Sequence, residues 1–237
     1  MALIEHKRPA GRLFGKIQAR GAGSAGRRSG RKSGRYAMIK SILDRGLAAI
    51  ALILLSPVFA LIAASIRLTT GDRVFFSHRR IGAGGQPFGC LKFRTMVPDA
   101  KEQLDLILAS DPVAREEWEE DFKFERDSRV TRIGSILRKT SLDELPQLIN
   151  VLRGDMALVG PRPITEAETL RYGQHYQAYK LVRPGLTGLW QVSGRSDTTY
   201  DERIALDVAY VRSASLATDL SILLRTVHCV LSRRGAV

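Results

Sequence analysis

An uncharged apolar run from Gly46 to Ile66 constrains the fold of this chain more than any other feature. Its 21 residues contain no acidic side chain, no lysine, no arginine and no histidine. A helix of this length extends about 31 Å at 1.5 Å per residue, which matches the hydrocarbon thickness of a bilayer. We do not expect a cleaved signal peptide, because the run is too long and begins too far from the N-terminus. A buried core helix is the alternative, but so uniformly apolar a run favours a membrane helix.

The middle of this run carries Ser56 and Pro57, which predict a break in the helix. Proline removes a backbone hydrogen bond and clashes with the preceding turn, and the Ser56 hydroxyl can satisfy a freed carbonyl. Basic residues flank the run on both sides, and such residues stay cytoplasmic. A straight span would place one flank outside, so the charges favour a re-entrant hairpin over a span. The flanking residues are Arg35, Lys40 and Arg45 before the run, and Arg67, Arg73, Arg79 and Arg80 after it.

The net charge of +13 is concentrated at the N-terminus. Residues 1–36 hold ten Lys or Arg and one acid, which gives +10 − 1 = +9 and leaves +4 for the rest. This segment is also rich in Gly and Ser and cannot bury a core, so we expect a disordered tail. It could bind nucleic acid or an anionic membrane surface, or it could be a solvated linker. Only Phe14 and Tyr36 are available for base stacking, and the apolar run follows directly, so we expect anionic membrane lipids and no nucleic acid as partner.

Beyond the apolar run the sequence predicts helices and a few short strands. Strands at residues 74–76 and 88–93 flank a glycine-rich segment at 82–87, for which we expect a hairpin turn rather than a phosphate-binding loop. Asp111 followed by Pro112 predicts a helix N-cap and a first helical residue. The predicted helices cover residues 100–110, 112–124, 132–137, 165–181, 200–212 and 216–231.

These patterns predict an α/β protein that is mostly helical and membrane-associated. Residues 1–36 are expected to form the basic tail and residues 37–68 the re-entrant membrane helix hairpin. Residues 69–237 are expected to form a small cytosolic catalytic domain with short strands.

Two adjacent acids, Asp143 and Glu144, are the strongest candidate for a site. Ser141 and Glu144 have the spacing of a capping box, so a helix is expected to begin near Ser141. Acids at a helix N-terminus commonly do no more than complement its dipole. Arg138 and Lys139 lie directly upstream, and such a combination is typical of a site that holds a cation and a phosphate together. The expected apolar stripe is Leu142, Leu145, Ile149 and Leu152, and the expected polar face is Asp143, Gln147 and Asn150.

Other chemistries find no support in the sequence. Cys90 and Cys229 are not spaced like metal ligands and suit a reducing compartment. The four histidines are scattered, so no zinc pattern exists. The chain contains no P-loop, no defensible Ser-His-Asp order and no internal repeat.

Three motifs carry a family resemblance. They are KFRTM at residues 92–96, RKTSLDELPQLINVLRGDMALVGPRP at 138–163 and RPGLTGLWQVSGR at 183–195. From about Ser41 to about Arg234 the chain resembles the bacterial sugar transferases known as monotopic phosphoglycosyl transferases. The resemblance is to the type that initiates exopolysaccharide synthesis with galactosyl or glucosyl phosphate. It implies a UDP-hexose and undecaprenyl phosphate, a polyprenyl phosphate, as substrates, and UMP as a product.

The resemblance also implies roles for individual residues. Asp143 is expected to be the nucleophile, forming an aspartyl-phosphosugar intermediate and sharing Mg²⁺ or Mn²⁺ with the diphosphate. Glu144 is expected to hold the metal or its water, or to orient the second substrate. The implied location is the bacterial inner membrane, with the catalytic domain facing the cytosol. The expected substrate-binding residues are Lys92, Arg94, Arg138, Gln147, Arg162, Arg195 and Asp219, of which Asp219 is alternatively a helix N-cap.

Two other functions compete with this interpretation. A non-enzymatic, membrane-tethered basic binding protein would explain the tail and the apolar run but would leave Asp143 and Glu144 unused. An ordinary glycosyltransferase would release UDP instead of UMP. The sequence names neither the hexose nor the polysaccharide, and a homo-oligomer is compatible with it.

Overall fold

The computed structural model describes residues 29–71, 73–121, 124, 127–194 and 198–231. The chain divides into one unit of residues 1–38 and another of residues 39–237, and the second unit contains both sheets. The described part is mostly helical with a few short strands, as the sequence predicts, and the strands form two two-stranded sheets. Helix α2 (Ser29–Leu54) begins inside the expected tail, so residues 29–36 are helical. Residues 1–28 of that tail lie outside the described residues.

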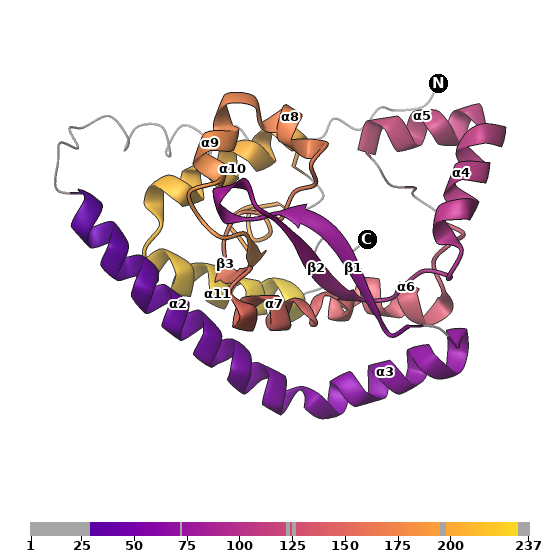
Figure 1. Cartoon of the computed structure of the whole chain (residues 1–237), viewed down its shortest axis with the longest axis horizontal. Helices are drawn as coiled ribbons and strands as arrows, with labels where there is room; N and C mark the ends of the chain where they lie inside the picture. Colours follow the sequence, from indigo (N-terminus) through magenta and orange to yellow (C-terminus); the bar gives the residue numbers. More distant parts are fainter. Residues whose placement is uncertain (1–28, 72, 122–123, 125–126, 195–197, 232–237) are drawn as a thin grey trace, which may run out of the picture. The chain divides into compact units, whose positions relative to one another are not determined.

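The predicted break of the apolar run is confirmed. Helix α2 ends at Leu54, α3 (Ser56–Thr70) begins two residues later, and the two are bent by 62° (Figure 1). The Ser56 hydroxyl donates a hydrogen bond of 2.8 Å to the Ile53 carbonyl, as its position before Pro57 predicts. Among the described helices none alone has the length and apolar character of a membrane span, whereas this bent pair together does.

One face of the bent pair is buried and the other is not. Ala48 of α2 and Ile62 and Ile66 of α3 belong to the buried core. A continuous set of large apolar side chains faces outward along both helices. This exposed apolar face consists of Ile42, Leu43, Leu47, Ile50, Ile53, Leu54, Leu61 and Leu68.

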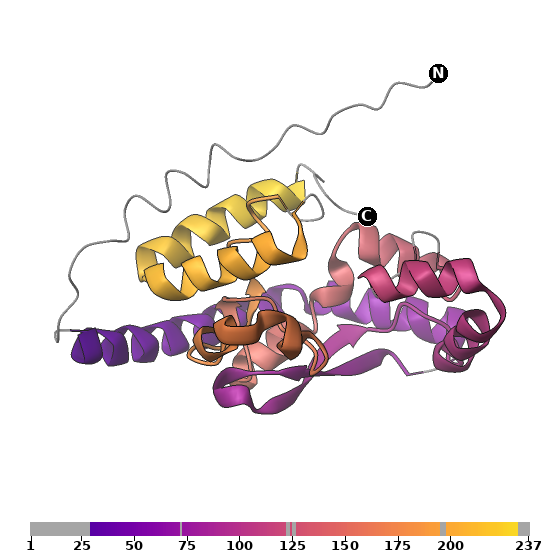
Figure 2. The same ribbon diagram turned by 90° about the horizontal axis from the view of Figure 1, so that it is seen from above.

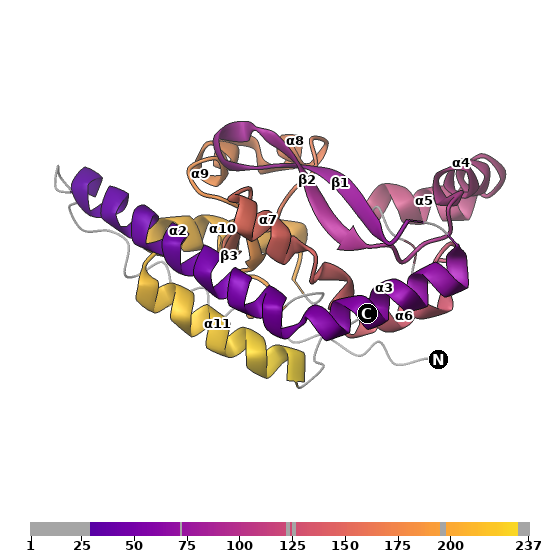
Figure 3. The ribbon, with the colours of Figure 1, turned by 60° about the horizontal axis from the view of Figure 1, so that its bottom comes forward.

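Lys40 is not the free flanking charge that the sequence suggests. Its ammonium forms ion pairs of 3.2 Å with Asp44 and 2.9 Å with Asp219, and all three side chains are largely buried. Asp219 lies on α11 (Leu216–Leu231), which runs beside α2 in Figure 3. The N-cap interpretation of Asp219 is wrong, because the Ser215 hydroxyl accepts the hydrogen bond from the Thr218 amide. The carboxylate of Asp219 instead ties the C-terminal helix to α2.

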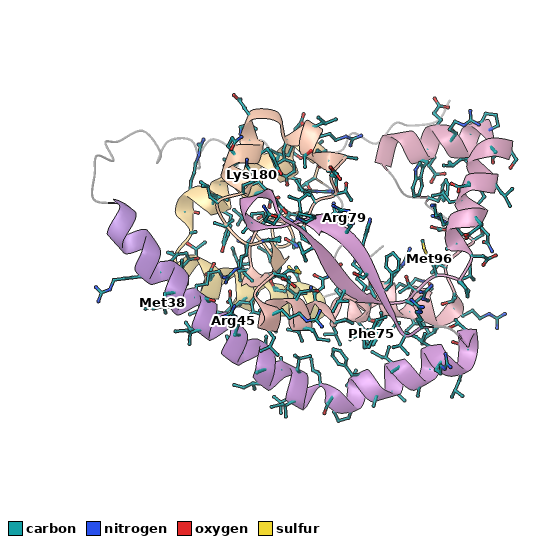
Figure 4. The ribbon with its side chains drawn as sticks, viewed as in Figure 1. Met38, Arg45, Phe75, Arg79, Met96 and Lys180 are labelled. Carbon is teal, nitrogen blue, oxygen red and sulfur yellow. The ribbon has the colours of Figure 1, made fainter. Side chains whose placement is uncertain are left out.

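The first sheet is the predicted hairpin. Strands β1 (Phe75–Ile81) and β2 (Pro87–Phe93) pair antiparallel, with Phe75 opposite Phe93. A 3₁₀ turn, Ala83–Gly85, joins them, and the positive φ of Gly84 favours glycine there. Figure 4 labels Phe75 at the beginning of β1, where its ring stacks on Phe93 at 5.5 Å. The glycine-rich segment is therefore a hairpin turn, as expected.

The second sheet was not predicted. Strands β3 (Ala157–Val159) and β4 (Gly185–Thr187) pair in parallel and are mostly buried. They lie between α7 (Gln147–Arg153) and α11, and α7 contacts β2 as well. In Figure 2 the hairpin therefore lies on one side of this central layer, and α11 with α10 (Tyr200–Ser213) lies on the other.

The remaining helices largely follow the sequence pattern. The Asp111 carboxylate caps α5 through the amides of Val113 and Ala114, as predicted. The helix expected over residues 165–181 is interrupted instead, because Gly173 has a φ of 47° between two short helices. The helices not yet given are α4 (Ala100–Ser110), α5 (Pro112–Asp121), α6 (Arg132–Lys139), α8 (Glu168–Tyr172) and α9 (Tyr176–Tyr179), with 3₁₀ turns at Leu142–Glu144 and Gly173–His175.

Three buried clusters hold these elements together. One joins α2, α7, β3, α10 and α11 through Ala48, Val151, Met156, Tyr210 and Ile222. A second lies under the hairpin turn and α8 to α10, and a third joins α3, the end of β2 and α6. The acid pair lies in the 3₁₀ turn between α6 and α7. Because α7 packs in the first cluster and α6 in the third, the helices on both sides of the acid pair are held in place.

Candidate active site

The acid pair lies in a 3₁₀ turn and not in the first turn of an α-helix. The α-helix begins at Gln147, and Ser141 has a left-handed φ of 56° with no capping hydrogen bond from its side chain. The predicted capping box is therefore wrong, because the Glu144 carboxylate bonds to Lys92 instead. Ser141 is the one non-glycine residue with positive φ in the described part of the chain. Such a conformation costs about 1–3 kcal/mol, which the surrounding packing must offset.

The polar side of this segment faces inward, against expectation. Asp143, Gln147 and Asn150 are buried, whereas Leu152 of the predicted apolar stripe is exposed. The side-chain amide of Asn150 explains this orientation. Its oxygen accepts a hydrogen bond from the Leu91 backbone N–H (2.9 Å), and its nitrogen donates to the Gly89 backbone carbonyl of β2 (2.8 Å). Helix α7 is thus fixed to the hairpin by hydrogen bonds that satisfy buried polar groups on both partners.

Lys92 of β2 joins the two acids. Its ammonium lies 2.7 Å from Glu144 Oε1 and 3.7 Å from Asp143 Oδ2. Burial raises the pKa of Asp143 and the adjacent Glu144 adds to the rise, while Lys92 and Arg138 oppose it. Burial acts in the same direction on Glu144, but the Lys92 ammonium and nearby arginines hold its pKa below the usual range. The pKa values of the two adjacent carboxyls are therefore shifted in opposite directions, and the Lys92 ion pair keeps Glu144 ionised.

Arg138 reaches this site from the end of α6. Its Nε donates a hydrogen bond of 3.0 Å to the Thr95 hydroxyl, just beyond β2. Helix α6 approaches that backbone closely, because a Cβ at Gly134 would overlap the Thr95 backbone. The close approach gives Arg138 its position, from which its charge lowers the pKa of Asp143.

A second set of charges surrounds Glu168. Its Oε2 accepts from Arg80 Nη1 at 3.1 Å and from the Thr165 amide at 2.7 Å, and its Oε1 lies 3.6 Å from Arg162 Nη1. Arg80 also donates to the Pro163 carbonyl at 3.2 Å. These contacts fix the Gly-Pro-Arg-Pro segment beside the acid pair, because Arg162 and Arg80 both help to lower the pKa of Glu144.

The buried carboxyl of Asp207 lies against the backbone of Arg162. Asp207 of α10 is 1% exposed and accepts a 2.7 Å hydrogen bond from the Tyr172 hydroxyl. Burial raises the pKa of Asp207 to about 7, although the Tyr172 hydroxyl, the Arg162 backbone amide and the Arg162 charge oppose the rise. The second oxygen of Asp207 has no hydrogen-bond partner among the described residues.

The structure gathers most of the predicted site residues. Asp143, Glu144, Lys92, Arg138 and Arg162 lie together by the contacts and charge effects above, and Gln147 lies in the next turn. Two predicted residues have their contacts elsewhere: Arg94 donates to the Arg73 carbonyl at 3.1 Å, and Asp219 pairs with Lys40 and with Tyr210. Arg195 lies outside the described residues.

Several residues of the site were not predicted from the sequence. Arg80, Glu168, Arg203 and Trp190 all lie near Arg162. A Thr-x-x-Glu pattern at residues 165–168 was the available signal, since Thr165 and Glu168 form the reciprocal hydrogen bonds of a capping box. Arg203 and Trp190 gave no local signal, because their contact joins segments that are distant in sequence.

The donor groups at the acid pair suit one kind of metal site. In the described part of the chain, no three His, Cys, Asp or Glu side chains gather as ligands. Mg²⁺ is commonly bound through one or two carboxylates together with substrate phosphates. Asp143 and Glu144 fit this arrangement, in which the diphosphate supplies the remaining ligands.

Comparison with known proteins places these residues in a family. The sequence model of the family described as bacterial sugar transferase matches residues 35–233, which include every site residue named above. A UDP-galactose-lipid carrier transferase of Erwinia amylovora is 54% identical over 166 residues, 70% of this chain and 35% of that protein. The exopolysaccharide production protein ExoY of Rhizobium meliloti is 48% identical over 199 residues, 84% of this chain and 88% of ExoY.

A third relative has a name that states its activity. The undecaprenyl-phosphate galactose phosphotransferase of Salmonella typhimurium is 46% identical over 206 residues, 87% of this chain and 43% of that protein. The chain thus spans less than half the length of the Erwinia and Salmonella relatives and most of the length of ExoY. It belongs to the bacterial sugar transferase family.

Asp207→Asn is expected to remove a pH dependence of folding stability. The carboxyl has a pKa of about 3.8 when unfolded and about 7 in the fold. The stability that it contributes is therefore complete below the unfolded pKa and is lost as the pH rises through about 7. Three pKa units correspond to about 4 kcal/mol. Asparagine stays neutral and still accepts from Tyr172, so melting temperatures at about pH 5 and about pH 8 should differ less than in the wild type.

Asp201→Asn is the matched control, because Asp201 is an exposed acid on the same helix. It should keep the pH dependence of the wild type. An Asp207→Asn variant that loses as much stability as the wild type over this range would show that Asp207 is not the responsible group.

Proposed function

We propose that this protein transfers hexose 1-phosphate from UDP-galactose or UDP-glucose to undecaprenyl phosphate and so initiates exopolysaccharide synthesis. The observation that carries the proposal is the Asp143–Lys92–Glu144 contact beside the arginines of the Gly-Pro-Arg-Pro segment. The names of the Erwinia and Salmonella relatives support the substrate class, and ExoY supports the process. A basic binding protein would leave this arrangement of charges without a use.

The proposed reaction has two displacements at one phosphorus. Asp143 Oδ attacks the phosphorus next to the hexose, the bond to the bridging oxygen breaks, and UMP leaves with that electron pair. An oxygen of undecaprenyl phosphate then attacks the aspartyl phosphosugar, and the Asp143 carboxylate is released unchanged. Glu144 accepts a 2.7 Å hydrogen bond from Lys92, whereas Asp143 lies 3.7 Å from it, which leaves Asp143 as the carboxylate available to attack.

The basic residues and a divalent cation have one shared task. The attacking carboxylate and the diphosphate are both negative, so positive charge must lie between them. Lys92 and Arg138 supply part of it from fixed positions, and Arg162 is placed to bind phosphate oxygens. Mg²⁺ or Mn²⁺ held by Asp143 and the diphosphate would supply the rest of the charge neutralisation.

The location proposed for this site is the cytosolic face of the bacterial inner membrane. The exposed apolar face of α2 and α3 is larger than soluble proteins usually leave uncovered. The bend at Ser56 and Pro57 suits a hairpin that enters and leaves on one side. Helix α11 adds a second exposed apolar stripe, and the basic N-terminal segment suits anionic lipids. The stripe on α11 is Leu216, Leu220, Leu224 and Val227.

Asp143→Asn is expected to abolish turnover and covalent labelling, because an amide does not replace a carboxylate as nucleophile. The wild-type chain is incubated with UDP-sugar labelled in the β-phosphate, without acceptor, then quenched and mapped. Label should be found on Asp143. Asp105→Asn, an exposed acid on α4, is the matched control and should label as the wild type does. Label on another residue, or turnover without any label on the protein, would contradict the proposed mechanism.

The released nucleotide separates the proposal from its nearest competitor. UDP-galactose and UDP-glucose are assayed in turn with undecaprenyl phosphate in a membrane fraction. UMP is the expected nucleotide product. Release of UDP would identify an ordinary glycosyltransferase, and release of no nucleotide from any UDP-sugar would favour the binding-protein alternative.

Turnover is expected to require Mg²⁺ or Mn²⁺. The physical reason is the repulsion between the Asp143 carboxylate and a diphosphate, which the basic residues offset only in part. Excess chelator should stop the reaction, and added Mg²⁺ should restore it. Undiminished turnover in excess chelator would contradict the metal role and leave neutralisation to the basic residues alone.

Both ends of the bent helix pair are expected on the cytosolic side. Single cysteines at Ala37 and Thr69, in a background without Cys90 and Cys229, are exposed to a membrane-impermeant thiol reagent in intact cells. Neither should react until the cells are opened. Reaction of one site in intact cells would establish a true span. Replacement of Ser56 and Pro57 by leucine is expected to straighten the helix and to expose one of the two sites.

A further inference from the structure

The indole ring of Trp190 is shared by two arginines from distant segments. Arg203 of α10 lies with its Cζ 4.6 Å from the ring centroid, and Arg162 of the Gly-Pro-Arg-Pro segment lies at 5.8 Å. Arg203 also lies 5.5 Å from the ring of Tyr200. The rings hold both guanidinium groups in place, since cation–π contacts of this kind are attractive.

Two hydrogen-bond donors lack acceptors in the arginine cluster, which consists of Arg80, Arg162, Glu168, Trp190, Tyr200 and Arg203. Trp190 Nε1 and Arg203 Nε are buried, and neither has a hydrogen-bond partner among the described residues. A buried donor without a partner costs about 1–3 kcal/mol. Two such donors on touching side chains therefore indicate that a ligand with acceptor oxygens belongs there.

The cluster also carries uncompensated positive charge. Arg80, Arg162 and Arg203 contribute +3 and Glu168 contributes −1, which leaves +2 while Asp207 is protonated and +1 when it is ionised. The oxygens of Glu168 accept from Arg80, Thr165 and Tyr200 and lie near Arg162, so Glu168 acts on Arg203 only through its charge and not through a hydrogen bond. Burial and the charge of Arg162 both lower the pKa of Arg203, which is the effect expected of crowded cations. An anion bound here would relieve that repulsion.

Arg162 links this cluster to the acid pair. Its charge helps to lower the pKa of Glu144 on one side, and its guanidinium contacts the Trp190 ring on the other. A diphosphate with one phosphorus at Asp143 therefore has its second phosphate directed to the arginines. The excess positive charge suits the dianion of a phosphate monoester, which the second phosphate becomes when the bond between the attacked phosphorus and the bridging oxygen breaks.

We infer that Arg203, Trp190 and Arg162 form the subsite that binds the phosphate of the leaving nucleoside monophosphate. The inference rests on the proposed function. Arg203 donates from Nε and the guanidinium to phosphate oxygens, and Trp190 Nε1 donates alongside it. The lipid acceptor carries a phosphate monoester too, so the same chemistry has two sources, and the test distinguishes them.

Fluorescence of Trp190 reports binding directly, without turnover. The chain has two tryptophans, so Trp118→Phe leaves Trp190 as the only one. The full chain in detergent is titrated with UMP, with uridine and with farnesyl phosphate. Arg203→Met is expected to weaken UMP binding by about tenfold or more, since charge-assisted hydrogen bonds are lost. Arg212→Met, an exposed arginine on the same helix, is the matched control and should bind UMP as the parent does.

Arg203→Lys guards against an effect on folding, because it keeps the charge and the stem but loses the guanidinium fork. Its affinity for UMP should fall between those of the parent and Arg203→Met, with an unchanged melting temperature. Uridine and farnesyl phosphate should bind the parent and Arg203→Met equally. A selective loss of farnesyl phosphate binding would overturn the assignment to the nucleotide.

The outcome for this subsite is separable from that for the reaction. Equal UMP affinity in the parent, Arg203→Met and Arg203→Lys, while the wild type still releases UMP from UDP-sugar, overturns the subsite and leaves the proposed function intact. A wild type that releases no UMP and binds none overturns both. Weakened UMP binding in both Arg203 variants, with UMP release by the wild type, supports both.

Discussion

The ammonium of Lys92 lies between two carboxylates that would otherwise repel each other, and the surrounding elements are arranged around that contact. The two carboxylates differ in their distance from the Lys92 ammonium. Glu144 accepts the short hydrogen bond and has a lowered pKa, whereas Asp143 is farther away and has a raised one. Two adjacent carboxylates thus have pKa values shifted in opposite directions, in part because Lys92 lies closer to one of them than to the other. In the proposed reaction Asp143, which has the longer contact with Lys92, is the carboxylate available to attack phosphorus, and Glu144 holds Lys92 in place.

The position of Lys92 depends in turn on how the hairpin meets α7. A two-stranded sheet leaves backbone groups of β2 without a partner, and the Asn150 side chain satisfies two of them. Helix α7 must therefore turn its polar side toward the hairpin. The same rotation buries Asp143 and exposes Leu152. Backbone hydrogen bonding, and not apolar burial alone, decides which face of this segment lies inward.

Features with a local cause were predictable from the sequence, and features with a partner far along the chain were not. The break at Ser56 and Pro57, the hairpin turn and the Asp111 cap each arise from neighbouring residues. The capping box at Ser141 failed because Lys92, 52 residues away from Glu144, attracts the glutamate more strongly than a backbone amide does. The N-cap interpretation of Asp219 failed for the same reason, since the cation that its carboxylate binds is 179 residues distant. The parallel pair β3 and β4 joins segments too short to show a strand pattern.

The resulting site is electrically asymmetric. At the acid end Asp143, Glu144 and Lys92 sum to −2 + 1 = −1, and Arg138 brings this to zero. At the other end Arg80, Arg162, Arg203 and Glu168 sum to +2, or to +1 when the buried Asp207 is ionised. A diphosphate is therefore attracted more strongly by the arginine end than by the acid end, where it must approach a carboxylate. In the proposed reaction, binding at the arginines holds the phosphorus against that carboxylate, so that remote binding energy assists a reaction between like charges. Under this proposal the neutral acid end alone would bind the donor weakly, and the arginines alone would bind it without reaction.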